Sequence, residues 1–304
     1  MKPITSLLVL LLLSSLSWGQ GFDWVTHLPG LSEELANDVE LGRSGNAYAC
    51  GAFGNTMIFP NATETAVGSR DAFVVKFDEQ GDVLWYTLLN STLQEQALAL
   101  GIDSLENIYL LMEVGDTLHV QGNVLTGFNT FYLVVKLDSS GQYLDHFEPI
   151  SALNAPGLFI AALDVSPAGR ISLGGSFGAS TSNSQSITIG TQTLTLPVNP
   201  NNGFRVPQGF AAQYRPDGTA AWARRTNGSG NSFLNDLAAA PAGGMAVCGT
   251  FGPVSGPGNS SFNFGAGTPL LSTDFGEAGF VARLDSGGNV LWAEAMQPGQ
   301  PVAS

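Results

Sequence analysis

The sequence predicts an all-β protein built from repeated four-stranded units. Glycine accounts for 38 of 304 residues, and 44% of the residues are hydrophobic while only 12% are charged. Glycine is usually about 7% of a protein, and a disordered chain carries far fewer apolar residues. This composition therefore suits many short strands joined by glycine-rich turns. A four-fold repeat of strand–turn–strand segments leads to the same fold class.

The clearest repeated segment is an apolar strand, a turn and a second strand. Apolar runs such as AFVVKF lead into a turn that has glycine at a constant offset, a pattern typical of β-hairpins. The turn glycines are Gly81, Gly141, Gly218 and Gly288. The strand after each turn carries at one equivalent position Trp85, Asp145, Trp222 or Trp292. The sequence around Trp24 predicts a fifth strand of this type.

A second repeated segment precedes the first in every unit. Its copies are GNAYACGAFG at 45–54, ENIYLLMEVG at 106–115, GRISLGGSFG at 169–178 and GGMAVCGTFG at 243–252. With one more strand before it, each copy completes a unit of four strands. The predicted units are 38–89, 98–150, 161–226 and 235–297, with an orphan strand at 22–29. Residues 181–203 of the third unit predict an extra strand pair or a long loop.

Ser176 lies in GGSFG, which matches the G-x-S-x-G turn of α/β-hydrolases. The equivalent positions in the other units hold Ala52, Glu113 and Thr250, and no helical pattern follows Ser176. A nucleophile elbow requires such a helix. The match is therefore interpreted as a by-product of the repeat, and no catalytic residue is assigned.

Repeated four-stranded units favour a β-propeller, in which sheets stack radially and bury one another's faces. The alternative is a linear β-solenoid, whose repeats are usually shorter, roughly 20–30 residues. In a propeller we expect two sets of shared aromatic residues to pack between blades. These are Phe53, Phe177 and Phe251, and Trp85, Trp222 and Trp292.

The segments GNAYACGAFG and DAFVVKFDEQGDVLW resemble the SBBP (seven-bladed beta-propeller) repeat of secreted bacterial proteins. The match is best at 45–54 with 71–85 and at 243–252 with 279–292. The third unit departs from the pattern at Gln213 and Arg215, and the second lacks the tryptophan. The resemblance implies a bacterial extracellular or cell-surface protein, often with a C-terminal sorting or adhesion module, and it implies no shared catalytic residues.

The N-terminus predicts a secretory signal peptide over residues 1–19, followed by propeller repeats over 20–304. Lys2 precedes an apolar run at 7–13, and Ser17-Trp18-Gly19 forms a small-residue cleavage site. The run is too short to span a bilayer, which needs roughly 20 residues. Because the first strand of a further unit would begin beyond Ser304, the strand count predicts a fragment. A complete four-bladed ring is the competing interpretation.

The sequence shows no pattern typical of a metal, cofactor or nucleic-acid site. His27, His119 and His146 are isolated, and the D-x-x-G segments are interpreted as turns rather than calcium loops. Cys50 and Cys248 occupy equivalent slots in distant units, which predicts two buried free thiols. The net charge of −14 would repel nucleic-acid phosphates.

Two acidic or polar loops, 30–38 and 91–99, follow equivalent strands and should gather on one face of a propeller. Glu33, Glu34 and Glu95 are the weak candidates for binding residues there. Solvated turns are the simpler interpretation of the same loops.

The sequence favours a secreted or cell-surface, non-enzymatic repeat protein that serves as a scaffold or binds an unknown protein or glycan partner. The alternative is the propeller portion of a larger secreted hydrolase or carbohydrate-binding protein, with its active module elsewhere in the gene product. Fold alone does not separate the two, because function belongs to sites.

Overall fold

The computed structural model describes residues 24–296 except 116, 127–131, 155, 180–182, 184, 200–202, 254–259, 265–269 and 273–275. The predicted signal peptide, 1–19, therefore lies outside the described residues. The described chain is all-β and contains no helix, as the composition predicted. Its main body is four four-stranded antiparallel sheets, which we call units 1 to 4 in chain order.

The four units have the same strand order, and each is a meander of neighbouring antiparallel strands. Unit 1 contains β1 (Glu34–Leu41), β2 (Ala47–Phe53), β5 (Asp71–Phe77) and β6 (Val83–Leu89). Unit 2 contains β7 (Gln96–Ile102), β8 (Ile108–Glu113), β11 (Tyr132–Leu137) and β12 (Tyr143–Phe147). Unit 3 contains β14 (Phe159–Val165), β15 (Ile171–Phe177), β18 (Gln208–Tyr214) and β19 (Ala220–Arg225). Unit 4 contains β21 (Asn231–Ala239), β22 (Met245–Gly252), β25 (Ala278–Leu284) and β26 (Val290–Met296).

Every unit also carries a small hairpin between its second and third main strands. The hairpins are β3–β4 (Thr56–Phe59, Ala62–Thr65), β9–β10 (Thr117–Val120, Asn123–Thr126), β16–β17 (Ser186–Ile189, Gln192–Thr195) and β23–β24 (Ser260–Asn263, Leu270–Ser272). The short strands β13 (Ala152–Asn154) and β20 (Asn227–Gly228) extend the last two. The strand pair that the sequence offered as one interpretation of residues 181–203 is therefore present as β16–β17, whereas the equivalent hairpins of the other units were not predicted.

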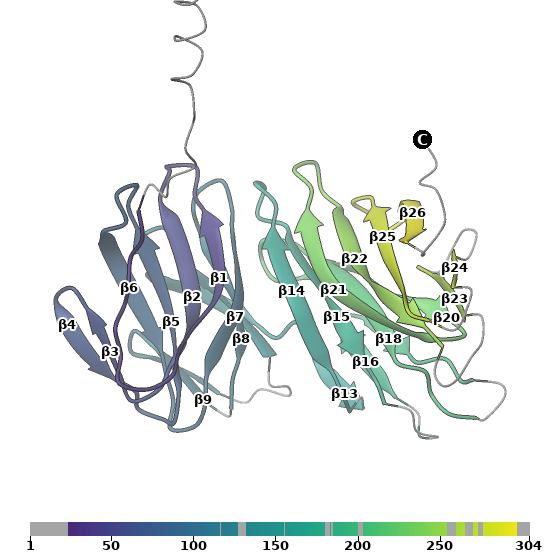
Figure 1. The fold of residues 1–304 in the computed structure, drawn as a ribbon, viewed down its shortest axis with the longest axis horizontal. Helices are drawn as coiled ribbons and strands as arrows, with labels where there is room; N and C mark the ends of the chain where they lie inside the picture. Colours follow the sequence, from purple (N-terminus) through teal and green to yellow (C-terminus); the bar gives the residue numbers. More distant parts are fainter. Residues whose placement is uncertain are drawn as a thin grey trace, which may run out of the picture.

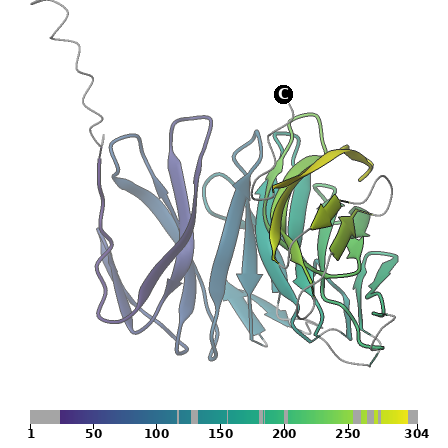
Figure 2. The same cartoon turned by 45° about the vertical axis from the view of Figure 1, so that its right-hand side comes forward.

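The units follow one another in a row along the chain (Figure 1). The first strands bring neighbours together: β7 contacts unit 1, β14 contacts β7, and β21 contacts unit 3. In both views the first unit and the last lie apart, and no sheet formed by the described residues is closed (Figure 2).

The turn between the third and fourth strands of each unit is stabilised by its own aspartate. Asp78 Oδ1 accepts hydrogen bonds from the main-chain N–H groups of Gln80 and Asp82, both at 2.9 Å. The turn ends on Gly81 with a φ of 85°, a left-handed conformation that favours glycine. Asp138 and Asp285 repeat the arrangement, and unit 3 uses Asp217 instead. We call these the Asp–Gly turns, and the interpretation of D-x-x-G as a turn is confirmed.

An aromatic side chain from each of units 1 to 3 packs on the Asp–Gly turn of the next unit. A Cβ added to Gly288 would come within 2.6 Å of the Trp222 ring, and one added to Gly141 within 2.8 Å of the Trp85 ring. The indole N–H groups complete the contact, because Trp85 donates to Ser139 O at 3.2 Å and Trp222 donates to Ser286 O at 3.0 Å. Each such contact between neighbouring units is called a seam. Glycine is required there because any side chain would displace the ring.

The same seam is formed on unit 1 by a segment outside the four-stranded sheets. The Trp24 ring lies against Gly81 and 5.9 Å from the Phe77 ring centre. The following residues pair with the β3 edge, where Ile58 N donates to Pro29 O at 2.8 Å. Residues 24–29 form no regular strand, although an orphan strand was expected at 22–29. Trp24 nevertheless occupies the position that the last strand of a preceding unit would fill.

At two units the aromatic contact differs from the one that alignment of the repeat predicts. Asp145 stands in register with Trp85, but it is Phe147, two residues later on the same face, that lies against Gly218. Trp292 was expected to pack between units, yet its side chain is 48% exposed in the described structure. Unit 4 therefore presents the seam tryptophan without a turn on it.

Ser176 lies within β15, between Phe159 on β14 and Gly209 on β18, and is only 8% exposed. It is not at a strand–helix turn, so the geometry agrees with a by-product of the repeat. Cys50 and Cys248 are free thiols as predicted. Only Cys50 is buried, however, because Cys248 is partly exposed on the β22 strand of unit 4.

A buried polar cluster joins units 1 and 2 beside their seam. Glu106, in the β7–β8 turn, accepts hydrogen bonds from Tyr48 Oη at 2.7 Å and Ser44 N at 2.8 Å, and it pairs with Lys76 Nζ at 3.3 Å. Desolvation of the Glu106 carboxylate opposes ionisation, but the hydrogen bonds from Ser44, Tyr48 and Lys76 prevail and lower its pKa to about 2. The lysine also lies 4.8 Å from the Tyr48 ring centre.

The seam predicts unequal effects at two equivalent tryptophans. Trp222→Ala should lower the free energy of unfolding by about 3 kcal/mol, because the substitution removes a buried ring and leaves a cavity. Trp292→Ala is the matched control and should change it by less than about 0.5 kcal/mol, since its side chain is exposed. Urea unfolding followed by circular dichroism measures both. Equal losses for the two variants would contradict the seam.

The Glu106 cluster predicts a pH-dependent contribution to stability. The folded pKa lies below the usual value of 4.5, so the contribution is present above about pH 4.5 and is lost as pH falls towards about 2. Glu106→Gln should cost about 1–2 kcal/mol of unfolding free energy at pH 7. The difference from the unsubstituted protein should shrink between pH 4.5 and pH 2 in chemical unfolding. A constant difference across that range would contradict the assignment.

Candidate functional site

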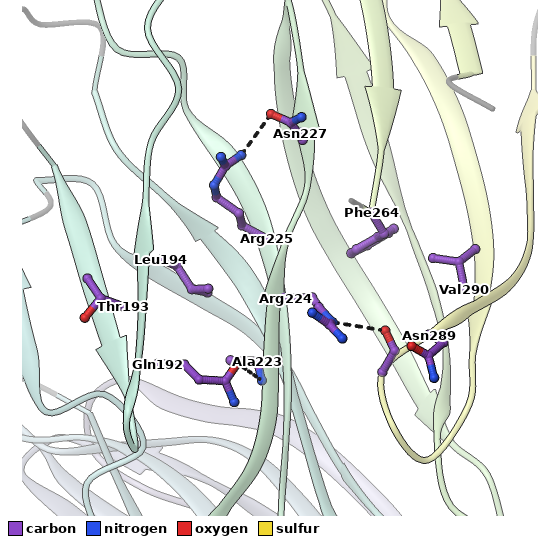
Figure 3. Close-up of a pocket in the computed structure, with 11 residues that line it drawn as sticks. Gln192, Thr193, Leu194, Ala223, Arg224, Arg225, Asn227, Phe264, Asn289 and Val290 are labelled. Carbon is purple, nitrogen blue, oxygen red and sulfur yellow. Dashed lines mark hydrogen bonds between the residues drawn. The ribbon is translucent and has the colours of Figure 1, made fainter. Parts of the chain in front are cut away.

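A pocket with a volume of about 660 Å³ lies at the seam between units 3 and 4 (Figure 3). Strand β19 of unit 3 crosses it, with the tip of the β16–β17 hairpin on one side and the Asp–Gly turn of unit 4 on the other. Ligand pockets commonly have volumes of about 300–1,000 Å³. We call this hollow the arginine pocket, after Arg224 and Arg225.

The two arginines are placed by the seam itself. Arg224 follows Trp222 by two residues, so it lies on the face of β19 that meets unit 4, and its Nε donates to Gly288 O at 3.3 Å. Arg225 lies on the opposite face, where its Nη1 donates to Thr226 O at 2.8 Å and Asn227 Oδ1 at 3.1 Å. Figure 3 shows the two side chains on either side of the strand.

Neither guanidinium forms an ion pair within the described residues, where the salt bridges join Arg70 with Glu33 and Lys76 with Glu106. Partial burial lowers the pKa of Arg225 from its usual value by desolvation. Asp285 is an acidic group whose pKa the Arg224 charge affects. Its lowered pKa comes first from the Asn289 side chain and main chain and least from Arg224. Two positive charges thus line the pocket without a bound carboxylate.

The rest of the lining is amide and apolar, with one hydroxyl, that of Thr193. Gln192, Asn227 and Asn289 supply side-chain amides, and Leu194, Phe264 and Val290 supply apolar surface. Gln192 Oε1 accepts from Ala223 N at 3.2 Å, which ties the hairpin to β19. The described residues that line the pocket include no Asp, Glu, His, Cys or Ser. The arrangement can hold an anionic, hydroxyl-rich molecule, and the lining itself offers none of the usual proton-transfer groups.

The two loops that the sequence singled out meet at Arg70. Its Nη2 pairs with Glu33 Oε2 at 2.6 Å and its Nη1 donates to Gln96 Oε1 at 3.0 Å. Its main-chain oxygen accepts from Glu95 N at 3.0 Å. A small hollow of about 150 Å³ lies beside Arg70, lined by residues 94–96 of the second loop and by residues 113–115.

The three acidic candidates differ in their surroundings. Glu33 is exposed and ion-paired, while Glu34 accepts from Ser32 N at 3.2 Å. Glu95 is 1% exposed and accepts a hydrogen bond from the Ser91 hydroxyl. Desolvation raises the pKa of Glu95, outweighing the Ser91 hydroxyl and the Gly115 main chain. A binding role for these residues stays a prediction.

Carboxylates also gather along the first strands of the units. Asp38 Oδ2 accepts from Leu100 N at 2.8 Å, and Asp164 Oδ2 accepts from Ala239 N at 2.7 Å, so each links neighbouring first strands. The pKa of Glu40 is raised by desolvation and then by the charges of Asp164 and Asp38. Across the described part of the chain, no three His, Cys, Asp or Glu side chains come together as metal ligands.

Sequence reasoning missed the arginine pocket, although a signal was present. Arg224 and Arg225 are the only adjacent pair among 11 basic residues in a chain of net charge −14. The pocket itself also depends on the β16–β17 hairpin and on Phe264, which no local pattern connects with β19.

Comparison with known proteins does not assign the chain to a family. No family model matches the sequence, and no curated protein matches it. Among the described residues, no helix is long and apolar enough to cross a membrane.

The environment of Glu95 predicts a stabilising substitution. Its folded pKa is raised, so its contribution to stability is fully present below about pH 4.5 and declines as pH rises. Glu95→Gln removes the buried charge and can keep the Ser91 hydrogen bond, and should raise the unfolding free energy at pH 7 by about 1 kcal/mol. Glu33→Gln, at an exposed ion pair, is the control and should change stability little. Denaturant unfolding at pH 7 and pH 4 measures both, and destabilisation by Glu95→Gln at pH 7 would contradict the argument.

Proposed function

We propose that this protein is a secreted or cell-surface, non-enzymatic repeat protein of the β-propeller type, which serves as a scaffold by docking four-stranded units against one another. The observation that carries the proposal is the seam. The same aromatic-on-glycine contact recurs at each of the three junctions between the described units, and the Trp292 ring has no turn glycine against it among the described residues.

Several features support radial stacking of the units as propeller blades. Each four-stranded sheet packs against the next one along the chain, so units 2 and 3 have a neighbour on each side, and the first strands make the contacts between units. Meanders stacked in this way around an axis form a propeller, whose edges stay short and protected. The described units form an open row, so the proposal concerns blade-type stacking and not a closed ring. The similarity of 45–54 and 71–85 to the SBBP repeat points in the same direction.

The open face of unit 4 is the proposed docking surface. Leu291, Trp292 and Met296 of β26 are all exposed. The equivalent Trp85 and Trp222 rings each pack against a turn glycine. Their indole N–H groups donate to the carbonyl of the residue two positions before that glycine. The occupant that fits is therefore a four-stranded unit with an Asp–Gly turn of this repeat. In this proposal the scaffold binds other four-stranded units of the same repeat type.

The lining of the arginine pocket supports binding rather than catalysis, because its described residues include no Asp, Glu, His, Cys or Ser and its one hydroxyl, that of Thr193, has no such base beside it in the lining. The predicted signal peptide at 1–19 supports secretion. The second candidate, the propeller portion of a secreted hydrolase or carbohydrate-binding protein, places the active module elsewhere in the gene product. Robust glycosidase, esterase or peptidase activity that is lost on substitution of unit residues would overturn the non-enzymatic proposal.

The docking surface can be tested by exposing an Asp–Gly turn in the protein itself. Trp24 covers the turn of unit 1, so Trp24→Ser should free Gly81 to receive Trp292 of a second copy. We expect the variant to self-associate in a concentration-dependent way, measured by size-exclusion chromatography with light scattering. The unsubstituted protein should associate less, because its own Trp24 occupies the turn.

The double variant Trp24→Ser/Trp292→Ser is the matched control. It keeps the same exposed turn but lacks the ring that should enter it, so its association should return to the unsubstituted level. Association that persists in the double variant would come from non-specific exposure of unit 1 and would contradict the docking surface. So would a Trp24→Ser protein that remains folded and does not associate.

A further inference from the structure

We propose that the arginine pocket binds an acidic oligosaccharide, with Arg224 and Arg225 holding sugar carboxylate groups. This inference concerns a separate site from the docking face of unit 4, because Trp292 is not part of the pocket lining. The test of this site is therefore independent of the test of the scaffold function.

The charge of the pocket selects an anion. Arg224 uses Nε for Gly288 O, and Arg225 uses Nη1 for Thr226 O and Asn227 Oδ1. These contacts hold the guanidinium groups in place with main-chain and amide oxygens, none of which neutralises the charge. Asp285, the acidic neighbour of Arg224, is already bonded to the N–H groups of Gly287 and Asn289. A guanidinium that is held in place but not neutralised by an ion pair binds a planar carboxylate well.

The position of the two arginines selects a ligand longer than a single anion. They project from opposite faces of β19, an outer strand of unit 3, so one small ion does not bridge them easily. A chain that crosses the strand edge can present one acidic group to each side. The open shape of the lining, from the β17 strand to the Asp–Gly turn of unit 4, allows such a chain to lie across it.

The remaining lining favours carbohydrate over peptide. Side-chain amides of Gln192, Asn227 and Asn289 are suited to hydroxyl groups, which both donate and accept hydrogen bonds. Leu194, Phe264 and Val290 offer apolar surface for the C–H face of a sugar ring. A peptide would instead need deeper side-chain pockets or a free run of strand edge. Gln192 already occupies the N–H of Ala223 on the edge of β19.

The test is isothermal titration calorimetry of the purified protein with a galacturonate tetramer at low salt, about 20 mM. A galactose tetramer of equal length is the neutral probe, and a glutamate tetrapeptide tests the peptide alternative. We expect saturable binding of the galacturonate alone, weakening as salt is added. Arg225→Gln should raise its dissociation constant about tenfold or more, because a charge-assisted hydrogen bond is lost.

Arg224→Gln provides a second variant at an exposed position, where folding is not at risk, and should also weaken binding. Arg215→Gln removes an equal charge from the exposed turn of unit 3, outside the pocket, and should leave the dissociation constant unchanged. Four results would overturn the proposal. They are no binding of galacturonate, equal binding of the neutral tetramer, a preference for the peptide, and binding that neither pocket variant weakens.

Discussion

The structure depends on the close approach between an aromatic ring and a turn glycine at each junction between units. The turn is possible because glycine takes a positive φ at Gly81, Gly141, Gly218 and Gly288. The ring can approach because glycine has no side chain, and where the ring is Trp85 or Trp222 the indole N–H also donates to a carbonyl of the same turn. One residue thus serves the turn within its own unit and the packing of the unit before it. Because the same glycine is needed for the turn and for the contact with the preceding unit, the local chain geometry and the packing between units depend on one another.

The candidate site is a consequence of that junction. Trp222 brings β19 against the Asp–Gly turn of unit 4, and the turn then forms one wall of the arginine pocket. Arg224 occupies the place that Thr87 holds in unit 1, where the Thr87 hydroxyl donates to Gly141 O at 2.8 Å and Arg224 Nε donates to Gly288 O. The longer side chain keeps the repeat's hydrogen bond and adds a charge beside it. The hydrogen bond to the turn-glycine carbonyl is shared with the seam between units 1 and 2, but the charge of Arg224 is found only at the seam between units 3 and 4.

Sequence patterns were sufficient for the features that are local. Period-two runs such as 72–77 predicted strands, and the aspartate with glycine three residues later predicted turns that the structure confirms. The small hairpins also have a local signal, since TLHV and NVLT flank Gln121-Gly122, but the stronger repeat hid it. Alignment of the repeat placed Asp145 in the tryptophan position. Only packing shows that Phe147, two residues later on the same face, takes over the contact.

By itself the sequence determined the all-β class, the repeat and the turn chemistry, because each depends on residues that are neighbours along the chain. The tertiary structure decided which aromatic ring meets which turn, which tryptophan is left exposed, and how Arg224 and Arg225 come to share a pocket with Phe264 and Asn289. Those outcomes depend on distances between segments that lie tens of residues apart. Such distances are set by the packing of whole sheets, which a local pattern does not encode.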